Sequence, residues 1–175
     1  MQFELTEEQK EIKRAVREFC EREFTPELAL EYDQKEEFPW ENKKVLEENG
    51  LLGIQVPEEY GGAGAGMLSL AIVIEEVARV CASTSVILTT QALATDPLII
   101  GGDHTQKLKW LKPMAEGSVL GACAITEPAA GSDVTSINTT AVRKSGGYLI
   151  NGTKIFITNG GVSDIITVVA YTDKA

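Results

Sequence analysis

Two short runs of the chain combine residue types that could hold a flat ligand with a polar rim. They are residues 121–133 (GACAITEPAAGSD) and residues 154–161 (KIFITNGG). In each run an apolar, strand-like stretch stops abruptly at hydroxyl, amide and glycine residues. Backbone N–H groups and threonine hydroxyls at such an edge can hydrogen-bond the rim of a ring system, while an aromatic side chain covers one face. We therefore expect the two runs to converge on one ligand.

The first run also has a plainer interpretation. Pro128 can set the φ angle of a polar β-turn, and Gly131 can permit close approach of the backbone. Taken alone, the two interpretations of this run are about equally good. The presence of residues 156–158 (FIT) further along the chain favours the ligand site.

Together the two runs resemble the flavin-binding signature of the acyl-CoA dehydrogenases. Residues 57–62 (PEEYGG) are also similar to a segment that these enzymes carry between their early helices. The resemblance covers essentially the whole chain. It implies FAD as the cofactor and an acyl-CoA thioester as the substrate, oxidised to the trans-2-enoyl-CoA. It also implies that reduced FAD passes its electrons to an electron-transferring flavoprotein.

The resemblance assigns cofactor-binding roles to residues of the first run. Ile125 and Thr126 would give backbone and hydroxyl hydrogen bonds to the pyrimidine edge of the isoalloxazine. Ser132, which follows Gly131, would contact the pyrophosphate and the pantetheine of the substrate. Cys123 stands where Tyr or Phe often occurs in the family, so one face of the site is less aromatic.

The second run would complete the flavin site. By resemblance, Phe156 takes a position often held by Trp and packs on the ring face opposite the substrate. Ile157 and Thr158 would reach the O4/N5 edge of the ring. A hydrogen-bond donor at N5 orients the ring and polarises it to accept a hydride.

The resemblance places the acyl pocket and the catalytic base elsewhere. The stretch from Thr84 to Leu93 corresponds roughly to the helix that walls the acyl pocket, and plain core packing is an equal alternative there. The candidate wall residues are Ile87, Leu88, Thr89 and Leu93. The base of the family is a Glu on a C-terminal helical domain, expected beyond Ala175, so no catalytic residue is assigned in this chain. We expect Glu127 to be structural.

Composition argues against several other classes of protein. The chain has 16 basic and 26 acidic residues, a net charge of −10, which disfavours nonspecific binding to nucleic acid or anionic membranes. No apolar run reaches the roughly 20 residues of a membrane span. The single histidine, His104, disfavours a Ser–His triad and a multi-His metal site. The glycines of residues 61–66 fit no G-x-G-x-x-G register.

The cysteines and the first residues of the chain indicate in which cellular compartment the protein is expected. Cys20, Cys81 and Cys123 are widely spaced and lack metal-binding C-x-x-C spacing, which indicates reduced core residues. The N-terminus has the look of neither a secretion signal nor a transit peptide. These features favour the bacterial cytoplasm, with a processed organellar protein as the alternative.

The elements that must position the two runs form an α+β chain, with an all-α helical domain (residues 1–116) followed by an incomplete antiparallel β-domain (residues 117–175). A capping box at Thr6 and Gln9 predicts a first helix, which Pro26 closes. Further helices are expected at about 39–49, 67–81, 84–100 and 104–116, with Pro97 kinking or shortening the third of these. Strands are expected at 119–125, 139–143, 148–151, 154–158 and 165–172, with tight turns at Gly146 and Gly152.

Two alternatives to an acyl-CoA dehydrogenase remain. One is another flavoenzyme of the same fold, such as an acyl-CoA oxidase or a flavin monooxygenase. The other is a non-catalytic fragment or binding module in which Thr126 and Thr158 merely finish strands. For the complete protein, the resemblance further implies a homo-oligomer, a tetramer or a dimer.

Overall fold

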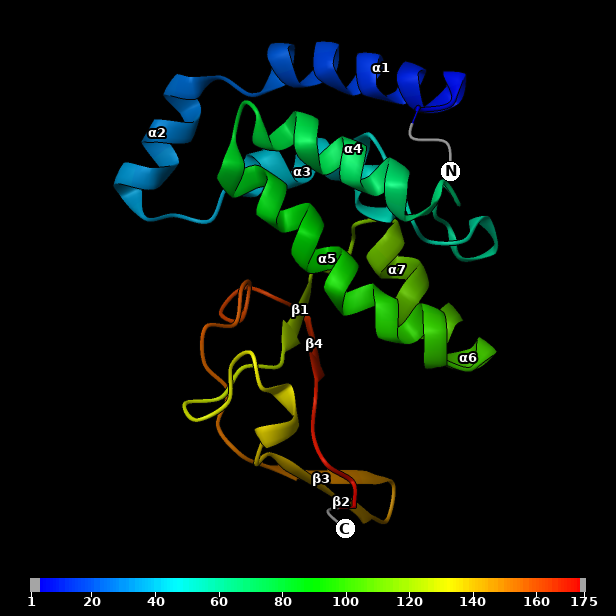
Figure 1. Ribbon diagram of the computed structural model, residues 1–175, viewed down its shortest axis with the longest axis vertical. Helices are drawn as coiled ribbons and strands as arrows, with labels where there is room; N and C mark the ends of the chain where they lie inside the picture. The colour runs from blue at the N-terminus through cyan, green and yellow to red at the C-terminus, as the bar shows by residue number, and fades with distance from the viewer. Residues whose placement is uncertain (1–3, 174–175) are drawn as a thin grey trace.

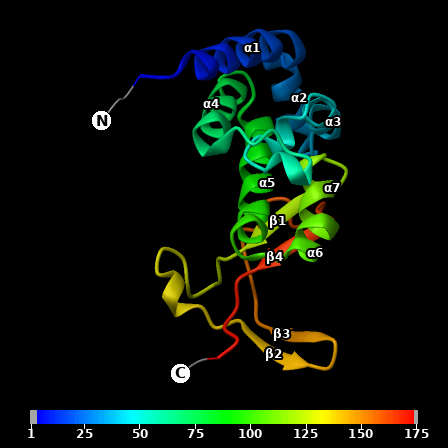
Figure 2. The same cartoon turned by 90° about the vertical axis from the view of Figure 1, so that its right-hand side faces the viewer.

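The computed structural model describes residues 4–173. Within this range seven α-helices, together with short 3-10 turns and a π-helical stretch, come first, and four short strands follow (Figure 1). Figures 1 and 2 show the helices packed together at one end of the molecule and a β-hairpin at the opposite end. The α+β fold class expected from the sequence is therefore confirmed.

Helix α1 (Glu7–Glu23) begins as the sequence predicts. The hydroxyl of Thr6 accepts a hydrogen bond from the backbone N–H of Gln9 (3.2 Å), and the side chain of Gln9 accepts one from the backbone N–H of Thr6 (3.0 Å). This capping box satisfies two backbone donors that the helix leaves unpaired at its start. The helix buries Val16 and Cys20 against its neighbours.

Helix α2 (Pro26–Lys35) is absent from the sequence prediction, which gives Pro26 only the role of closing the first helix. The structure shows that Pro26 also opens a helix, because a proline in the first turn lacks only an N–H that has no partner there. The Thr25 side chain caps this start by accepting from the N–H of Leu28 (3.2 Å). Helix α2 buries none of its residues fully, and only Leu28, Ala29 and Tyr32 are half-buried, so its apolar pattern is weak in the sequence.

The remaining helices lie near their predicted ranges. They are α3 (Trp40–Glu48), η1 (Leu51–Gly53), η2 (Glu58–Tyr60), α4 (Gly66–Ala78) and α5 (Ala82–Gly101). After a break at Gly102 and Asp103 come α6 (His104–Gln106), the π-helical stretch η3 (Lys107–Leu111) and α7 (Lys112–Ala115), which follow one another directly. Helix α5 continues past Pro97 to Gly101, so this proline does not shorten it.

The hydrophobic core lies between α1, α4 and α5. Phe24, Val73, Val77 and Leu88 are all at most 1% exposed there. Burying such side chains is the main force that holds amphipathic helices together, since isolated helices of this length are marginal in water.

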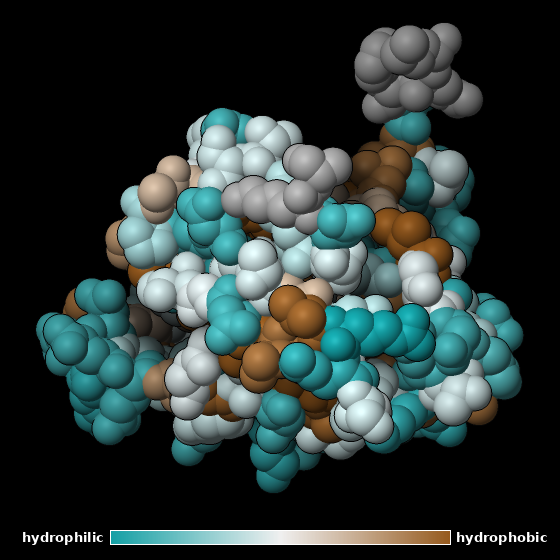
Figure 3. Space-filling model, turned by 90° about the horizontal axis from the view of Figure 1, so that it is seen from below, coloured by the Kyte–Doolittle hydropathy of each residue, from teal (hydrophilic) through white to brown (hydrophobic). Residues whose placement is uncertain are grey.

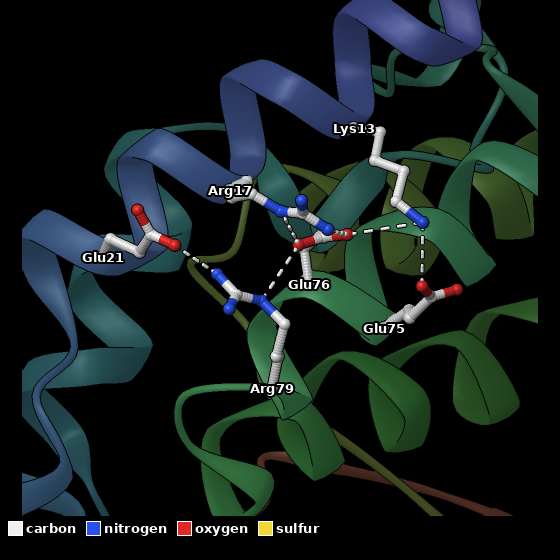
Figure 4. A network of polar contacts seen from close by, with 6 residues as sticks. All are labelled: Lys13, Arg17, Glu21, Glu75, Glu76 and Arg79. Atoms are coloured by element: carbon white, nitrogen blue, oxygen red, sulfur yellow. Dashed lines mark hydrogen bonds and ion pairs between the residues drawn. The ribbon is translucent and has the colours of Figure 1, made fainter.

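A buried carboxylate links α1 to α4 (Figure 4). Glu76 on α4 has no exposed side-chain surface, and Arg17 on α1 donates two hydrogen bonds of 2.8 Å to it. Lys13 and Arg79 add ion pairs to Glu76 at 3.5 and 3.4 Å, and Arg79 also contacts Glu21. The hydrogen bonds from Arg17 lower the pKa of Glu76 despite its burial, so the carboxylate is ionised and paired.

The strands form two separate pairs. Strands β2 (Thr140–Lys144) and β3 (Gly147–Asn151) make the expected antiparallel hairpin. Strands β1 (Gly121–Ala124) and β4 (Ile165–Val168) pair in parallel, so the antiparallel arrangement expected of the whole β-part is wrong for this pair. Parallel strands need a long crossover, and the connection between β1 and β4 contains the short turn η4 (Val134–Ser136) and the hairpin.

Residues 154–158 are not a strand, contrary to the sequence prediction. The segment is irregular, and Phe156 within it has φ = 55°, which is incompatible with an extended chain. Its β-branched and aromatic residues favour a strand, but the positive φ of Phe156 bends the chain instead.

Gln91 joins the helices to the β-part. This side chain of α5 is fully buried, and its amide N–H groups donate to the carbonyls of Met114 (2.7 Å) and Val119 (2.9 Å). Its Oε1 atom accepts from the N–H of Gly121 at the start of β1 (2.8 Å). Gly121 has no room for a side chain, because a Cβ there would lie 2.6 Å from that of Ala94. Strand β1 is thereby fixed against α5.

Candidate functional site

The two polar-ended runs lie side by side in the structure. The N–H of Ile155 donates to the carbonyl of Thr126 (3.0 Å), and Nζ of Lys154 donates to the carbonyl of Ile125 (2.7 Å). Further along, Nδ2 of Asn159 donates to the carbonyl of Gly121 (3.2 Å). The second run therefore follows the outer edge of β1, while β4 pairs with the other edge.

The end of β1 presents backbone donors rather than acceptors. The carbonyls of Ile125 and Thr126 are both occupied by the second run. Among residues 4–173, no hydrogen bond uses the N–H groups of Ile125 or Thr126. Both residues are half-buried, so these N–H groups are left to water or to a ligand. Such an edge suits a ligand whose rim carries carbonyl oxygens and ring nitrogens.

Phe156 stands beside this edge in a strained conformation. Its side chain is 89% exposed, and its φ of 55° is unusual for a bulky residue. Strain of this kind costs about 1–3 kcal/mol and is common at ligand sites. Because the backbone aims the ring outward, Phe156 can cover one face of a planar ligand.

Thr158 opens into a cleft of about 440 Å³ next to α5. The cleft is lined by the connection between α2 and α3, by the first turns of α5 and by the second run: Glu36, Glu37, Phe38, Pro39, Ser83, Val86, Ile87, Thr158 and Asn159. Among the described residues no hydrogen bond uses the hydroxyl of Thr158, so it is available to a ligand.

Glu127 directly follows the residues of this edge in the chain, and several protein groups donate to its carboxylate. It accepts from the hydroxyl of Thr139 (2.5 Å), from the N–H groups of Asn138 (2.6 Å) and Thr139 (2.9 Å), and from Lys154 (2.9 Å). These contacts, led by the Thr139 hydroxyl, lower the pKa of Glu127 to about 2. A carboxylate held in this way is a poor proton acceptor at neutral pH, which agrees with the expected structural role.

Comparison with known proteins identifies the family. Residues 6–118 match the model of the acyl-CoA dehydrogenase N-terminal domain, and residues 122–175 match that of the middle domain. The chain belongs to the acyl-CoA dehydrogenase family. A short-chain-specific acyl-CoA dehydrogenase of Clostridium acetobutylicum is 46% identical over 175 residues, which cover 99% of this chain and 46% of that protein.

Solved structures of the acyl-CoA dehydrogenase fold agree. Butyryl-CoA dehydrogenase of Megasphaera elsdenii superposes with a TM-score of 0.87 at 37% identity, covering 99% of this chain and 46% of that one. A chain from a structure of the electron-transferring flavoprotein of Acidaminococcus fermentans gives 0.90 at 40% identity over the same shares. An FAD complex of PigA gives 0.89 at 30% identity, covering 100% and 46%. This chain thus spans about half the length of these proteins.

Some of the residues that the family resemblance singled out lie apart from the second run or from the Thr158 cleft. Gly131 and Ser132 lie in an exposed turn, and no hydrogen bond of the described residues connects them to the second run. Thr89 and Leu93 lie on the exposed side of α5, outside the lining of the Thr158 cleft, and the Thr89 hydroxyl donates to the carbonyl of Ser85 (3.2 Å).

The remaining candidates divide between the core and the site. Leu88 is 1% exposed and belongs to the core, so for this residue plain packing is the better interpretation. Ile87 is almost as buried but reaches the cleft. Cys123 is half-buried in β1, where burial raises the pKa of its thiol and keeps it protonated. Ile157 is half-buried and accepts the N–H of Gly160 (2.9 Å) in the turn after it.

Three residues that build the site were given no role by sequence reasoning: Gln91, Lys154 and Asn159. A glutamine within a helix of apolar residues signals a buried polar contact, since such groups are kept only when satisfied. Lys154 and Asn159 lie inside the recognised run, but nothing in the sequence says that their partners are carbonyls of β1 and the residue after it.

Two further findings concern other kinds of site. None of the helices between residues 4 and 173 has the length and hydropathy of a membrane span. Within the same residues, His, Cys, Asp and Glu side chains nowhere gather in a group of three or more that could hold a metal ion.

Proposed function

We propose that this chain supplies the flavin edge and one wall of the substrate cleft of an FAD-dependent acyl-CoA dehydrogenase. The observation that carries the proposal is the set of unpaired N–H groups at Ile125 and Thr126, flanked by the exposed ring of Phe156 and the free hydroxyl of Thr158. Their chemistry fits the isoalloxazine, which has acceptor atoms along one edge and a flat apolar face.

Each residue has a stated task in this proposal. The N–H groups of Ile125 and Thr126 bind the pyrimidine edge, and the Thr126 hydroxyl adds a further donor. Phe156 covers the face opposite the substrate, and Thr158 donates to the O4/N5 edge. Cys123 and Ile157 flank the ring, while Gly131 lets Ser132 approach the pyrophosphate and the pantetheine. When bound, FAD accepts the β-hydride of the acyl group.

The proton chemistry needs a group beyond this chain. Glu127 is held ionised by Thr139, Asn138 and Lys154, and it is tied to structure rather than facing a substrate. We therefore assign removal of the α-proton to a carboxylate beyond Ala175. Thr89 and Leu93 on α5 are proposed to line the acyl chain where it leaves the Thr158 cleft.

The same proposal covers the organisation and partners of the complete protein. Residues 1–116 form its N-terminal helical domain, and residues 117–175 begin its middle β-domain. The substrate is an acyl-CoA, the electron acceptor is an electron-transferring flavoprotein, and the assembly is a homo-tetramer or dimer. Three free cysteines fit a reducing compartment such as the bacterial cytoplasm.

The test uses the complete protein that contains this chain. We expect it to bind FAD and to form enoyl-CoA from butyryl-CoA with an artificial electron acceptor, while producing negligible peroxide in air. Stoichiometric peroxide would instead identify an acyl-CoA oxidase. If purified protein neither retains FAD nor changes the absorbance of added FAD, the non-catalytic alternative is correct.

A further inference from the structure

Lys154 places a charged ammonium group inside the site. Its side chain is only 10% exposed, and Nζ lies 2.7 Å from the carbonyl oxygen of Ile125 and 2.9 Å from Oε1 of Glu127. Lysine is rarely buried unless its charge is paired. This arrangement differs from the exposed helical pairs of the chain, such as Lys112 with Glu116 at 3.8 Å.

The contact with Ile125 has a directional consequence. A trans peptide group is planar, so the carbonyl of Ile125 and the N–H of Thr126 belong to one rigid unit and point in opposite directions. Because Lys154 holds the carbonyl on one side, the N–H of Thr126 must point to the other side. That N–H is one of the two donors of this edge, and no hydrogen bond among residues 4–173 uses it.

Glu127 keeps Lys154 in this place. Its carboxylate is fixed by Asn138 and Thr139, which lead into β2, so the ammonium is held between two structured segments. The pair is also neutral as a whole, so the edge offers N–H donors without an unbalanced buried charge.

We propose that Lys154 is a positioning residue for the flavin, which aims the N–H of Thr126 at the ring by holding the carbonyl of Ile125, with Glu127 as its anchor. The inference rests on the proposed function. It goes further, because it names a side chain that orients the backbone donors of the flavin edge without touching the ring itself.

The test distinguishes two roles of Lys154: orienting the N–H of Thr126, or only neutralising the charge of Glu127. In the complete protein, Lys154→Met removes the hold on Ile125 and leaves Glu127 without its cation. The double variant Glu127→Gln with Lys154→Met removes both charges. We expect the double variant to recover most of the stability lost by the single variant, measured by urea unfolding of the apoprotein.

The affinity for FAD, measured by quenching of flavin fluorescence, is expected to behave differently. It should fall by roughly tenfold or more in both variants, as for one lost hydrogen bond to a ligand. Lys154→Arg retains a donor that can reach the Ile125 carbonyl and should recover part of the affinity. The visible absorption band of the flavin that remains bound should shift in Lys154→Met and return toward the wild-type position in Lys154→Arg.

Controls distinguish this inference from the proposed function. Lys112→Met removes an exposed cation of α7 and should change neither property. If the double variant regains both stability and FAD affinity, Lys154 is only a counter-ion and the inference is wrong. If wild-type protein binds FAD and Lys154→Met binds it equally well, the inference is also wrong while the proposed function stands. Failure of the wild-type protein to bind FAD removes both.

Discussion

Glu127 makes part of the stability of this chain depend on pH. Its hydrogen bonds with Thr139 and Asn138 and its pair with Lys154 hold its pKa at about 2, below the ordinary value of 4.5. A carboxylate whose pKa is lowered by folding contributes stability that is complete above the unfolded-state pKa. The contribution is lost as pH falls toward the folded-state pKa.

We therefore expect the unfolding free energy to decrease between about pH 4.5 and pH 2 through this residue. Glu127→Gln should be less stable at pH 7 and should lose less stability across that window. Urea unfolding at a series of pH values measures both slopes. Equal slopes for wild type and variant would show that protonation of Glu127 is not coupled to unfolding.

Thr158 tests the flavin edge directly. In the complete protein, Thr158→Ala should slow flavin reduction by at least roughly tenfold, because one donor to the developing negative charge is lost. The dissociation constant of the substrate should change less. Stopped-flow absorbance measures both quantities, and Thr153→Ala, at an exposed position in the preceding loop, serves as the control. An unchanged reduction rate would count against the N5 role.

At the scale of single residues, the sequence predicts features that depend on a residue's own type or on its near neighbours in the chain. The hydroxyls of Thr126 and Thr158, the ring of Phe156 and the capping box of Thr6 are visible as residue types. The partners of Lys154 and Gln91 are not, since they lie 29 and up to 30 residues away. Only the fold brings such groups together.

Among the elements, α5 determines where β1 lies. Its Gln91 satisfies two carbonyls and one N–H that would otherwise be buried without partners, and Thr167 of β4 donates to the carbonyl of Ala94 in the same helix (3.1 Å). The position of the proposed flavin edge is thus set by a core helix.

Gln91→Met should consequently destabilise the chain by about 3 kcal/mol or more, because three backbone groups lose their partners and each costs about 1–3 kcal/mol. Chemical unfolding of the 175-residue chain measures this loss. Gln106→Met removes only the exposed hydrogen bond from the N–H of Asp103 to the Gln106 side chain at the start of α6, and it should cost about 1 kcal/mol or less. A Gln91→Met variant within 1 kcal/mol of wild type, on the order of a single hydrogen bond, would contradict this role.

The elements also show what the sequence cannot specify. Helix α2 has only a weak apolar face, and its proline fits the end of one helix as well as the start of another. Short apolar runs such as β1 and β4 do not indicate their partner or its direction, so the sequence does not predict that these strands are parallel. The left-handed backbone of Phe156 overrides the strand-like pattern around it.

For the molecule as a whole, the β2–β3 hairpin leaves one strand uncovered. Every residue of β3 is exposed, including Tyr148 (55%), Leu149 (51%) and Ile150 (48%). Figure 3, which looks onto this end of the molecule, shows apolar surface among hydrophilic side chains. Among the described residues, β3 pairs only with β2, and its other edge is open.

An open, apolar strand edge promotes pairing between copies. We expect the 175-residue chain to self-associate as its concentration rises, and Leu149→Lys to move that transition to higher concentration. Size-exclusion chromatography with light scattering measures the mass of each species. Thr153→Lys adds the same charge outside the strands and should have less effect. Identical masses for Leu149→Lys and wild type at all concentrations would exclude this edge.

The parallel pairing of β1 with β4 has a consequence for biosynthesis. Helix α5 leaves the ribosome early and can pack with α1 and α4 while the rest is still being made, but β1 waits for β4, whose first residue is 44 positions further along. The run that contains Phe156 and Thr158 emerges within that interval. The prospective flavin cradle is therefore among the last features to assemble, and a nascent polypeptide arrested before Val168 would carry finished helices and no place for the cofactor.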